Sequence, residues 1–136
     1  EWAINCDFPI WGESAKGFFS EVSLNLFVTG AVTTLLPNLV GLNKAREMLM
    51  MGERYGAAEL HDLGIAWRVV ADSALTQEAL TTARKLAALP VLSTRAMKRV
   101  LYAAAVPDLH RALALETEAT VAGFLDPETT RLLKDF

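Results

Sequence analysis

The stretch AAELHDLGIAWRVV, residues 57–70, decides the fold class of this chain. Its first part, Ala57 to Leu63, is rich in helix-forming residues and stops at Gly64, a residue typical of helix ends. The second part, Ile65 to Val70, combines β-branched and aromatic side chains, which favours a strand. A helix followed directly by a strand predicts an α/β fold.

Short apolar runs lie upstream of this stretch. Phe8 to Trp11 and Gly17 to Phe19 are separated by Gly12-Glu-Ser14, which predicts two short strands around a turn. The next two segments, Ala31 to Val40 and Asn43 to Met51, are spaced for short helices. The first is irregular because it contains a proline, and we expect Asn43 to cap the second.

Downstream of residue 70 the apolar residues recur at helical spacing. Leu75 to Ala87 and Leu92 to Ala104 each predict an amphipathic helix. Asp108 can cap a third helix, and Asp126, followed by Pro127, can cap a fourth. The chain therefore divides into an α/β part, residues 1–72, and a helical part, residues 73–136.

Composition excludes several classes of protein. Of the 136 residues, 52% are hydrophobic and 21% charged, so the chain is globular rather than disordered. The net charge of -3, without a dense basic run, argues against a nucleic-acid partner. The longest charge-free run, Val22 to Leu42, contains six Ser, Thr and Asn residues and a proline, so we expect no membrane span. The single cysteine, Cys6, has no internal disulfide partner and indicates a reducing compartment.

Acid chemistry is the remaining candidate for catalysis. No Cys/His set has metal-ligand spacing, and His61 and His110 fit solvated helix faces, so we predict no metal site. Most acids also fit helix surfaces. Glu1 and Glu21 differ, because each adjoins apolar residues and they bracket one strand-turn-strand passage. Two carboxylates that converge on an apolar pocket can divide acid and base roles, although two ordinary surface acids explain the same pattern.

At these positions the sequence resembles the crotonase, or enoyl-CoA hydratase/isomerase, superfamily. The family places two Glu residues twenty positions apart, in patterns like E-L-A-x-x-C-D and A-x-F-x-x-P-E. The matching segments are Glu1–Asp7 and Ala15–Glu21, and further ordered matches follow at Leu36–Gly41, Lys44–Met48 with Gly52, and Ala58–Leu60 with Gly64–Val69. The resemblance implies the second half of a crotonase-like ββα-superhelix, followed by a C-terminal helical region.

The resemblance also implies a reaction. The substrate would be an acyl-CoA thioester, with coenzyme A as part of the substrate and no separate cofactor, and its carbonyl would lie between two backbone N–H donors. In a hydratase, Glu1 would activate the water and Glu21 would exchange the proton at the α-carbon, giving syn addition or removal of water through an enolate-like state. Asn25, Phe27 and Thr29, which follow the second acid, would line the acyl pocket.

This sequence departs from the family pattern after its second acid. The family often reads P-G-x-G-G-T there, whereas Val28–Thr33 reads VTGAVT. The first Gly of the family pattern gives an N–H to the catalytic water, and Thr29 keeps that N–H but adds bulk. The parts of the family that supply the oxyanion donors precede Glu1. We therefore expect the chain to be a C-terminal portion of a longer protein and to be inactive alone.

Two alternatives to a hydratase stay open. An isomerase of the family, in which one acid at the Glu21 position moves a proton between carbons, is the alternative to a hydratase. A non-catalytic assembly subunit is the other. The resemblance implies a homotrimer or a dimer of trimers, and we expect a cytoplasmic protein, with an organelle matrix as the alternative compartment.

Overall fold

The computed structural model describes residues 1–135. The first part of the chain alternates short helices and very short strands, and the second part consists of helices alone. The elements are, in chain order, α1 (Trp2–Asn5), β1 (Ile10–Gly12), β2 (Lys16–Gly17), the 3-10 helix η1 (Val22–Leu24), α2 (Val32–Val40), α3 (Leu42–Met51), β3 (Tyr55–Gly56), α4 (Ala57–Asp62), β4 (Arg68–Val70), the 3-10 helix η2 (Asp72–Ala74), α5 (Leu75–Ala87), α6 (Val91–Ala105), α7 (Leu109–Leu125) and α8 (Pro127–Asp135).

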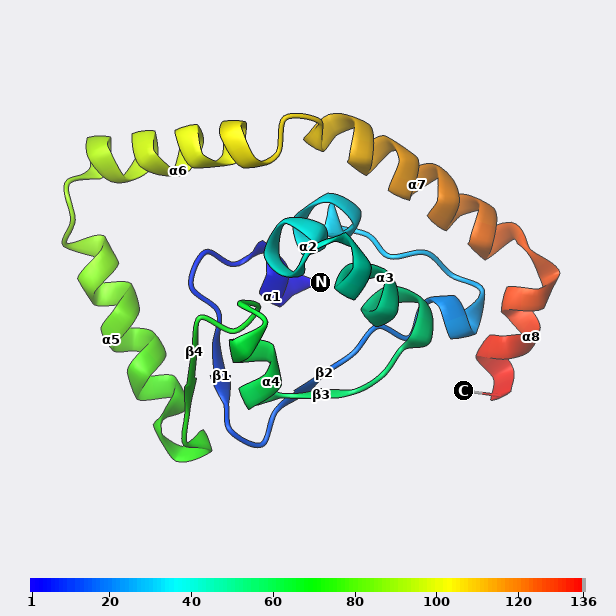
Figure 1. The fold of residues 1–136 in the computed structure, drawn as a ribbon, viewed down its shortest axis with the longest axis horizontal. Coiled ribbons are helices and arrows are strands. Elements are labelled where there is room, and N and C mark those ends of the chain that lie inside the picture. Colours follow the sequence, from blue (N-terminus) through cyan, green and yellow to red (C-terminus); the bar gives the residue numbers. More distant parts are fainter. Residues whose placement is uncertain (136) are drawn as a thin grey trace.

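Figure 1 shows two parts of different character. The elements from α1 to β4 gather in the middle, and α5 to α8 follow one another in an arc around them. The arc touches the middle part where α5 meets β1, where α7 meets α2 and where α8 meets η1. This is the α/β part followed by a helical region that the sequence predicts.

The two short strands form around a turn, as the sequence predicts, but they do not pair with each other. Strand β1 pairs in parallel with β4, with Trp11 opposite Val69. Strand β2 pairs antiparallel with β3, with Gly17 opposite Tyr55. The turn after Gly12 forms, but the hydrogen-bonding groups of both strands are met by the segment around residues 55–70.

The stretch that decides the fold class forms as a helix followed by a strand, although the strand is shorter than predicted. β4 begins at Arg68 rather than at Ile65. The amides of Ile65 and Ala66 instead donate to the carbonyl of Leu60, both at 2.9 Å, and close the C-terminal end of α4. Gly64, at φ +78°, makes this reversal because a left-handed backbone suits glycine.

The helix bounds agree with the sequence, and the predicted caps agree in part. The cap of α3 is Gly41, so the prediction of Asn43 as the cap is wrong; Asn43 lies inside the helix. Asp126 does cap α8, because its Oδ1 accepts the Glu128 amide at 2.8 Å. Asp108 occupies the cap position of α7, but its side chain makes no cap hydrogen bond.

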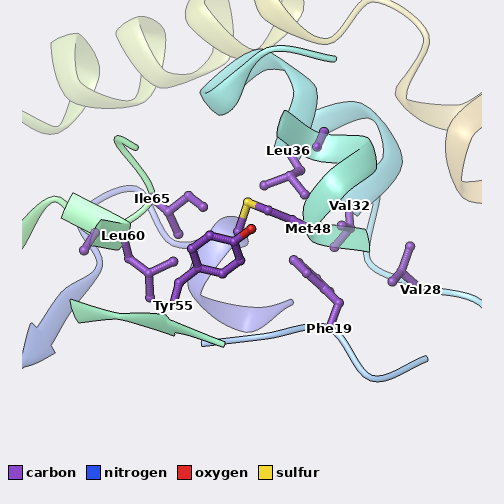
Figure 2. Packing of buried hydrophobic residues seen from close by; sticks show 10 residues of the cluster. Phe19, Val28, Val32, Leu36, Met48, Tyr55, Leu60 and Ile65 are labelled. Carbon is purple, nitrogen blue, oxygen red and sulfur yellow. The ribbon is translucent and has the colours of Figure 1, made fainter. Parts of the chain in front are cut away.

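The apolar core lies in the first part of the chain. Figure 2 shows Met48 of α3 at its centre, between Leu36 of α2 and Tyr55 of β3. The whole cluster consists of Phe19, Val28, Val32, Leu36, Ala45, Met48, Tyr55, Leu60, Ile65 and Ala66. Ala45 and Met48 therefore face the core, as their spacing on α3 predicts.

Helices α5 to α8 bury few side chains in the described part of the chain. Their buried residues are Glu116 of α7 and Thr129 of α8, and Val106 is buried in the link before α7. Apolar side chains of α6 lie open, with Leu92 84% exposed. No helix within residues 1–135 combines the length and the apolar character that a membrane crossing requires.

Candidate active site

Glu1 is held by one residue from a distant loop. It stands at the N-cap position of α1. The Thr29 amide donates to Glu1 Oε1 at 2.6 Å, and the Thr29 hydroxyl donates to Oε2 at 2.8 Å. Both carboxylate oxygens therefore have a donor, which fixes the carboxylate plane. The structure thus joins two of the residues that the sequence singled out.

The loop that carries Thr29 has an unusual backbone. Gly30 and Ala31, at φ +68° and φ +61°, are both left-handed, and Ala31 is one of two non-glycine residues with this conformation within residues 1–135. Such a conformation costs an alanine about 1–2 kcal/mol. The Asn5 side-chain amide of α1 donates to the Gly30 carbonyl at 2.9 Å and to the Glu1 carbonyl at 3.1 Å. Helix α1 and this loop are therefore tied at two places.

Glu116 binds the other side of the same loop. Its side chain is 2% exposed and comes from the middle of α7. The amides of Ala31 and Thr33 donate to it at 2.7 and 2.9 Å, and the Thr33 hydroxyl donates at 2.6 Å. A carboxylate at the first turn of α2 meets amides that have no partner inside the helix and is favoured by the helix dipole.

Glu21 lies in a different environment from Glu1. It precedes η1, and its carbonyl accepts the amides of Leu24 and Leu26 at 3.0 and 2.9 Å. Its Oε2 is buried and has no hydrogen-bond partner within residues 1–135. A buried carboxylate oxygen without a partner is costly, so it marks a position where a ligand, a water or another group belongs.

Asn25 and Phe27 belong to a cavity lining that includes neither Glu1 nor Thr29. Both line a cavity of about 400 Å³ between their own segment and α7. The Asn25 side chain donates to the Thr129 hydroxyl at 3.1 Å, and that hydroxyl donates to the Asn25 carbonyl at 3.1 Å. A Cβ at Gly123 would lie only 2.9 Å from the Asn25 carbonyl oxygen, so α7 approaches this loop closely.

The region beside Glu1 is apolar. A small cavity of about 60 Å³ is lined by Glu1 and Ala3 together with core residues such as Phe19, Met48 and Leu60. Glu1 therefore stands at the edge of the hydrophobic core. Elsewhere, His61 Nδ1 contacts the Ala66 carbonyl at 2.9 Å, and residues 1–135 hold no cluster of His, Cys, Asp and Glu that could bind a metal.

Sequence reasoning missed Glu116. The signal is present in the spacing of α7, because the residues one turn away on each side, Ala112 and Thr120, are uncharged and partly buried. An acid in the middle of an otherwise uncharged helix stripe predicts burial with donors. Nothing in the sequence identifies those donors, since they lie more than eighty residues earlier.

Comparison with known proteins agrees with this arrangement. The family model described as enoyl-CoA hydratase/isomerase matches residues 1–128. The chain belongs to the enoyl-CoA hydratase/isomerase family. This confirms the crotonase resemblance and the α/β fold with a helical region, and it does not test the individual site residues.

Curated relatives include both hydratases and isomerases of this family. The chain is 30% identical over 116 residues to a 1,2-epoxyphenylacetyl-CoA isomerase of Escherichia coli, covering 85% of the chain and 44% of that protein. It is 37% identical over 87 residues to a probable enoyl-CoA hydratase of Rhizobium meliloti, covering 64% and 34%. A short-chain-enoyl-CoA hydratase of Clostridioides difficile is 30% identical, with 86% and 76% covered. The chain spans less than half the length of the first two.

Solved structures of the family share the fold. An enoyl-CoA hydratase/isomerase from Pseudoalteromonas atlantica T6c superposes with a TM-score of 0.91 at 23% identity, covering 97% of this chain and 53% of that one. The OdaA protein of Pseudomonas aeruginosa gives a TM-score of 0.92 at 25% identity, with 98% and 55% covered. The elements described above therefore correspond to about half of a crotonase-fold chain.

Proposed function

We propose that the protein is an enoyl-CoA hydratase, in which Glu1 and Glu21 carry out acid and base catalysis on an acyl-CoA thioester. Water would add across the α,β double bond, with its oxygen bonding to the β-carbon and a proton going to the α-carbon. Membership of the family supports the substrate class. The unpartnered, buried oxygen of Glu21 is the observation that carries the proposal.

The two carboxylates differ in the way this reaction requires. Glu21 has one oxygen free of donors, so its lone pair is available for a proton at the substrate α-carbon. Glu1 has both oxygens engaged by Thr29, which holds the carboxylate in a fixed orientation. We assign the α-carbon proton to Glu21 and the water to Glu1.

The rest of the site is also part of the proposal. Two backbone N–H donors would stabilise the charge on the thioester oxygen, and such donors contribute several kcal/mol of transition-state stabilisation. We propose that these donors come from outside the 136 residues, so that a polypeptide of these residues alone does not convert the substrate. Phe27 and Asn25 would line the acyl pocket, and the exposed apolar residues of α6 and α7 support assembly as a trimer or a dimer of trimers.

Hydration of crotonyl-CoA by the natural full-length protein tests this function. The expected result is turnover by the wild type and a loss of kcat of about 10²- to 10⁴-fold in both Glu21→Gln and Glu1→Gln. The matched control is Glu13→Gln, which changes an exposed acid between the two without touching either. Wild-type turnover in Glu21→Gln would rule out the assignment and leave the non-catalytic assembly subunit as the better interpretation.

An isomerase is the second candidate, and one contact favours it. In this structure the Thr29 amide, which matches the water-binding N–H of the family pattern, donates to Glu1 instead. A reaction that moves a proton between carbons needs no water at that amide. Comparing a trans-2-enoyl-CoA with a trans-3-enoyl-CoA separates the two reactions. Thr29→Gly keeps the amide but removes the bulk of the side chain and its hydroxyl bond to Glu1, so it should raise hydration relative to isomerisation if the Thr29 side chain excludes the water.

A further inference from the structure

Glu116 is a buried carboxylate that the proposed reaction does not use. Its three donors, the amides of Ala31 and Thr33 and the Thr33 hydroxyl, all belong to the start of α2, and none is a cation. The side chain is 2% exposed, so it is withdrawn from water. A buried charge held by three donors is retained only where the hydrogen bonds offset its desolvation.

The first of these three donors, the Ala31 amide, belongs to a residue with a strained backbone conformation. Ala31 is left-handed at φ +61° and follows Gly30, which is left-handed at φ +68°. The Ala31 amide donates a hydrogen bond to Glu116 Oε2 at 2.7 Å, so Glu116 binds the strained residue directly. Backbone strain of this kind persists only where surrounding contacts enforce it.

One loop, residues 29–33, contacts both Glu116 and Glu1. Thr29 holds Glu1 through its amide and its hydroxyl, and the Gly30 carbonyl accepts the Asn5 amide of α1. Ala31, two positions further on, is held by Glu116. The loop is therefore clamped between α1 on one side and α7 on the other. If the α7 side were released, the left-handed pair would relax and the Thr29 donors would leave the Glu1 oxygens.

We propose that Glu116 is a positioning residue, which fixes the orientation of Glu1 through the loop 29–33. This inference rests on the proposed function, in which Glu1 handles the water or a substrate proton. It predicts that α7, far along the chain, sets the geometry of the N-terminal acid. Glutamine cannot replace the carboxylate, because its NH₂ group would face one of the three donors.

Amide hydrogen exchange and kinetics on the natural full-length protein test the proposal together. Glu116→Gln is expected to speed exchange of the Thr29 and Ala31 amides by about tenfold or more. It should also lower kcat for crotonyl-CoA by about 10- to 100-fold, with KM changed less than about twofold. Thr33→Val removes only one of the three donors and should shift both quantities in the same direction by less, which keeps the test open if Glu116→Gln folds poorly.

Asn38→Ala is the matched control. Asn38 also ties α2 to the helical arc, through its side-chain amide and the Ala105 carbonyl of α6 at 2.9 Å, but at the far end of α2 from Thr29. Asn38→Ala should lower stability while leaving Thr29 exchange and kcat unchanged. In a Glu1→Gln background, Glu116→Gln should cause no further loss of kcat, because the residue it positions is already gone.

The outcomes separate this inference from the proposed function. The positioning role is overturned if the Thr29 amide exchanges no faster in Glu116→Gln than in Asn38→Ala. It is also overturned if that amide exchanges faster in Glu116→Gln while kcat is unchanged. In both cases, a lowered kcat in Glu1→Gln still supports the proposed function. A further loss of kcat in the Glu1→Gln background also overturns it. Full activity in Glu1→Gln overturns both. If the wild type does not hydrate crotonyl-CoA, the function fails and the exchange data alone decide whether Glu116 fixes Thr29.

Discussion

The two parts of this chain are stabilised in different ways. Residues 1–70 hold a packed apolar cluster in which side chains such as Val32 and Leu36 are fully buried. Residues 75–135 form four helices that bury mainly two polar side chains, Glu116 and Thr129. The first part is held by apolar burial, and the second is attached to it by a small apolar cluster, in which Val106 packs with Ala31 and Leu35, and by a few hydrogen bonds.

This difference bears on how the site is built. Two of the hydrogen-bonded contacts that hold the helical arc to the first part fall beside candidate site residues: Glu116 on the loop of Thr29, and Thr129 on Asn25. An apolar interface would pack the arc without fixing any one atom. Directional hydrogen bonds specify a position, and they do so where an active site needs precision.

The largest expected effect comes from the core. Leu36→Ala should lower the free energy of unfolding by about 2–5 kcal/mol, because it leaves a cavity among fully packed neighbours. Leu92→Ala on α6, where the side chain is 84% exposed, should change it by less than about 0.5 kcal/mol. Denaturant unfolding of both variants measures the comparison. Equal losses would mean that α6 is packed as tightly as α2 in the folded protein.

The next effect tests one hydrogen-bonded attachment. Thr129→Val should cost about 1–3 kcal/mol, since it leaves the Asn25 amide and carbonyl without their partner. Thr117→Val on α7 is the control, because its hydroxyl donates only to Leu113 one turn earlier in the same helix. Thermal unfolding should separate the two variants. A loss in Thr117→Val as large as that in Thr129→Val would contradict attachment through Thr129.

A smaller effect is expected at the helix starts of the arc. Asp126→Ala should destabilise the protein by about 1 kcal/mol, because the Glu128 amide loses its acceptor. Asp108→Ala, at the equivalent position of α7, removes no cap hydrogen bond and should have a smaller effect. Urea midpoints compare them directly, and the reverse order would show that α7 is the better capped helix in solution.

The smallest effect is a pH dependence in the first part of the chain. Hydrogen bonds from Lys44 at 2.6 Å and then from Tyr55 at 3.0 Å lower the pKa of Glu47 below its ordinary 4.5. A lowered pKa in the folded state gives stability that is present above pH 4.5 and is lost as the pH falls through the folded pKa.

Unfolding measured from pH 6 to pH 3 checks this dependence. The wild type should lose slightly more stability over that range than Glu47→Gln, and Lys44→Met should reduce the difference. The effect is small because the pair is exposed to solvent. An identical pH dependence in the wild type and Glu47→Gln would mean that the carboxylate gains nothing from folding.

Local patterns in the sequence predicted local structure well. The helix bounds of α5 and the cap at Asp126 depend on residues within one or two turns, so periodicity and capping rules find them. Strand pairing is different, because β1 and β2 find partners more than thirty residues away. No local rule distinguishes those partners from each other, so the sequence pattern finds the two strands but not their pairing.

The candidate site shows the same difference between what local sequence patterns reveal and what long-range contacts add. Glu1 and Glu21 were found through the resemblance and their spacing, and Thr29 through its departure from the family pattern. The bond that joins Thr29 to Glu1 and the burial of Glu116 are contacts over 28 and 83–85 residues, which only the folded chain brings together. The sequence therefore names the acids, and the fold supplies what orients them.

Proton exchange at the substrate α-carbon tests the role of Glu21 most directly. Incubating butyryl-CoA with the full-length protein in D₂O should incorporate deuterium at that carbon, which mass spectrometry detects without any change in the acyl chain. We expect the exchange rate to fall by about 10²- to 10⁴-fold in Glu21→Gln and to be substantially faster in Glu1→Gln than in Glu21→Gln. Wild-type exchange in Glu21→Gln would contradict that role.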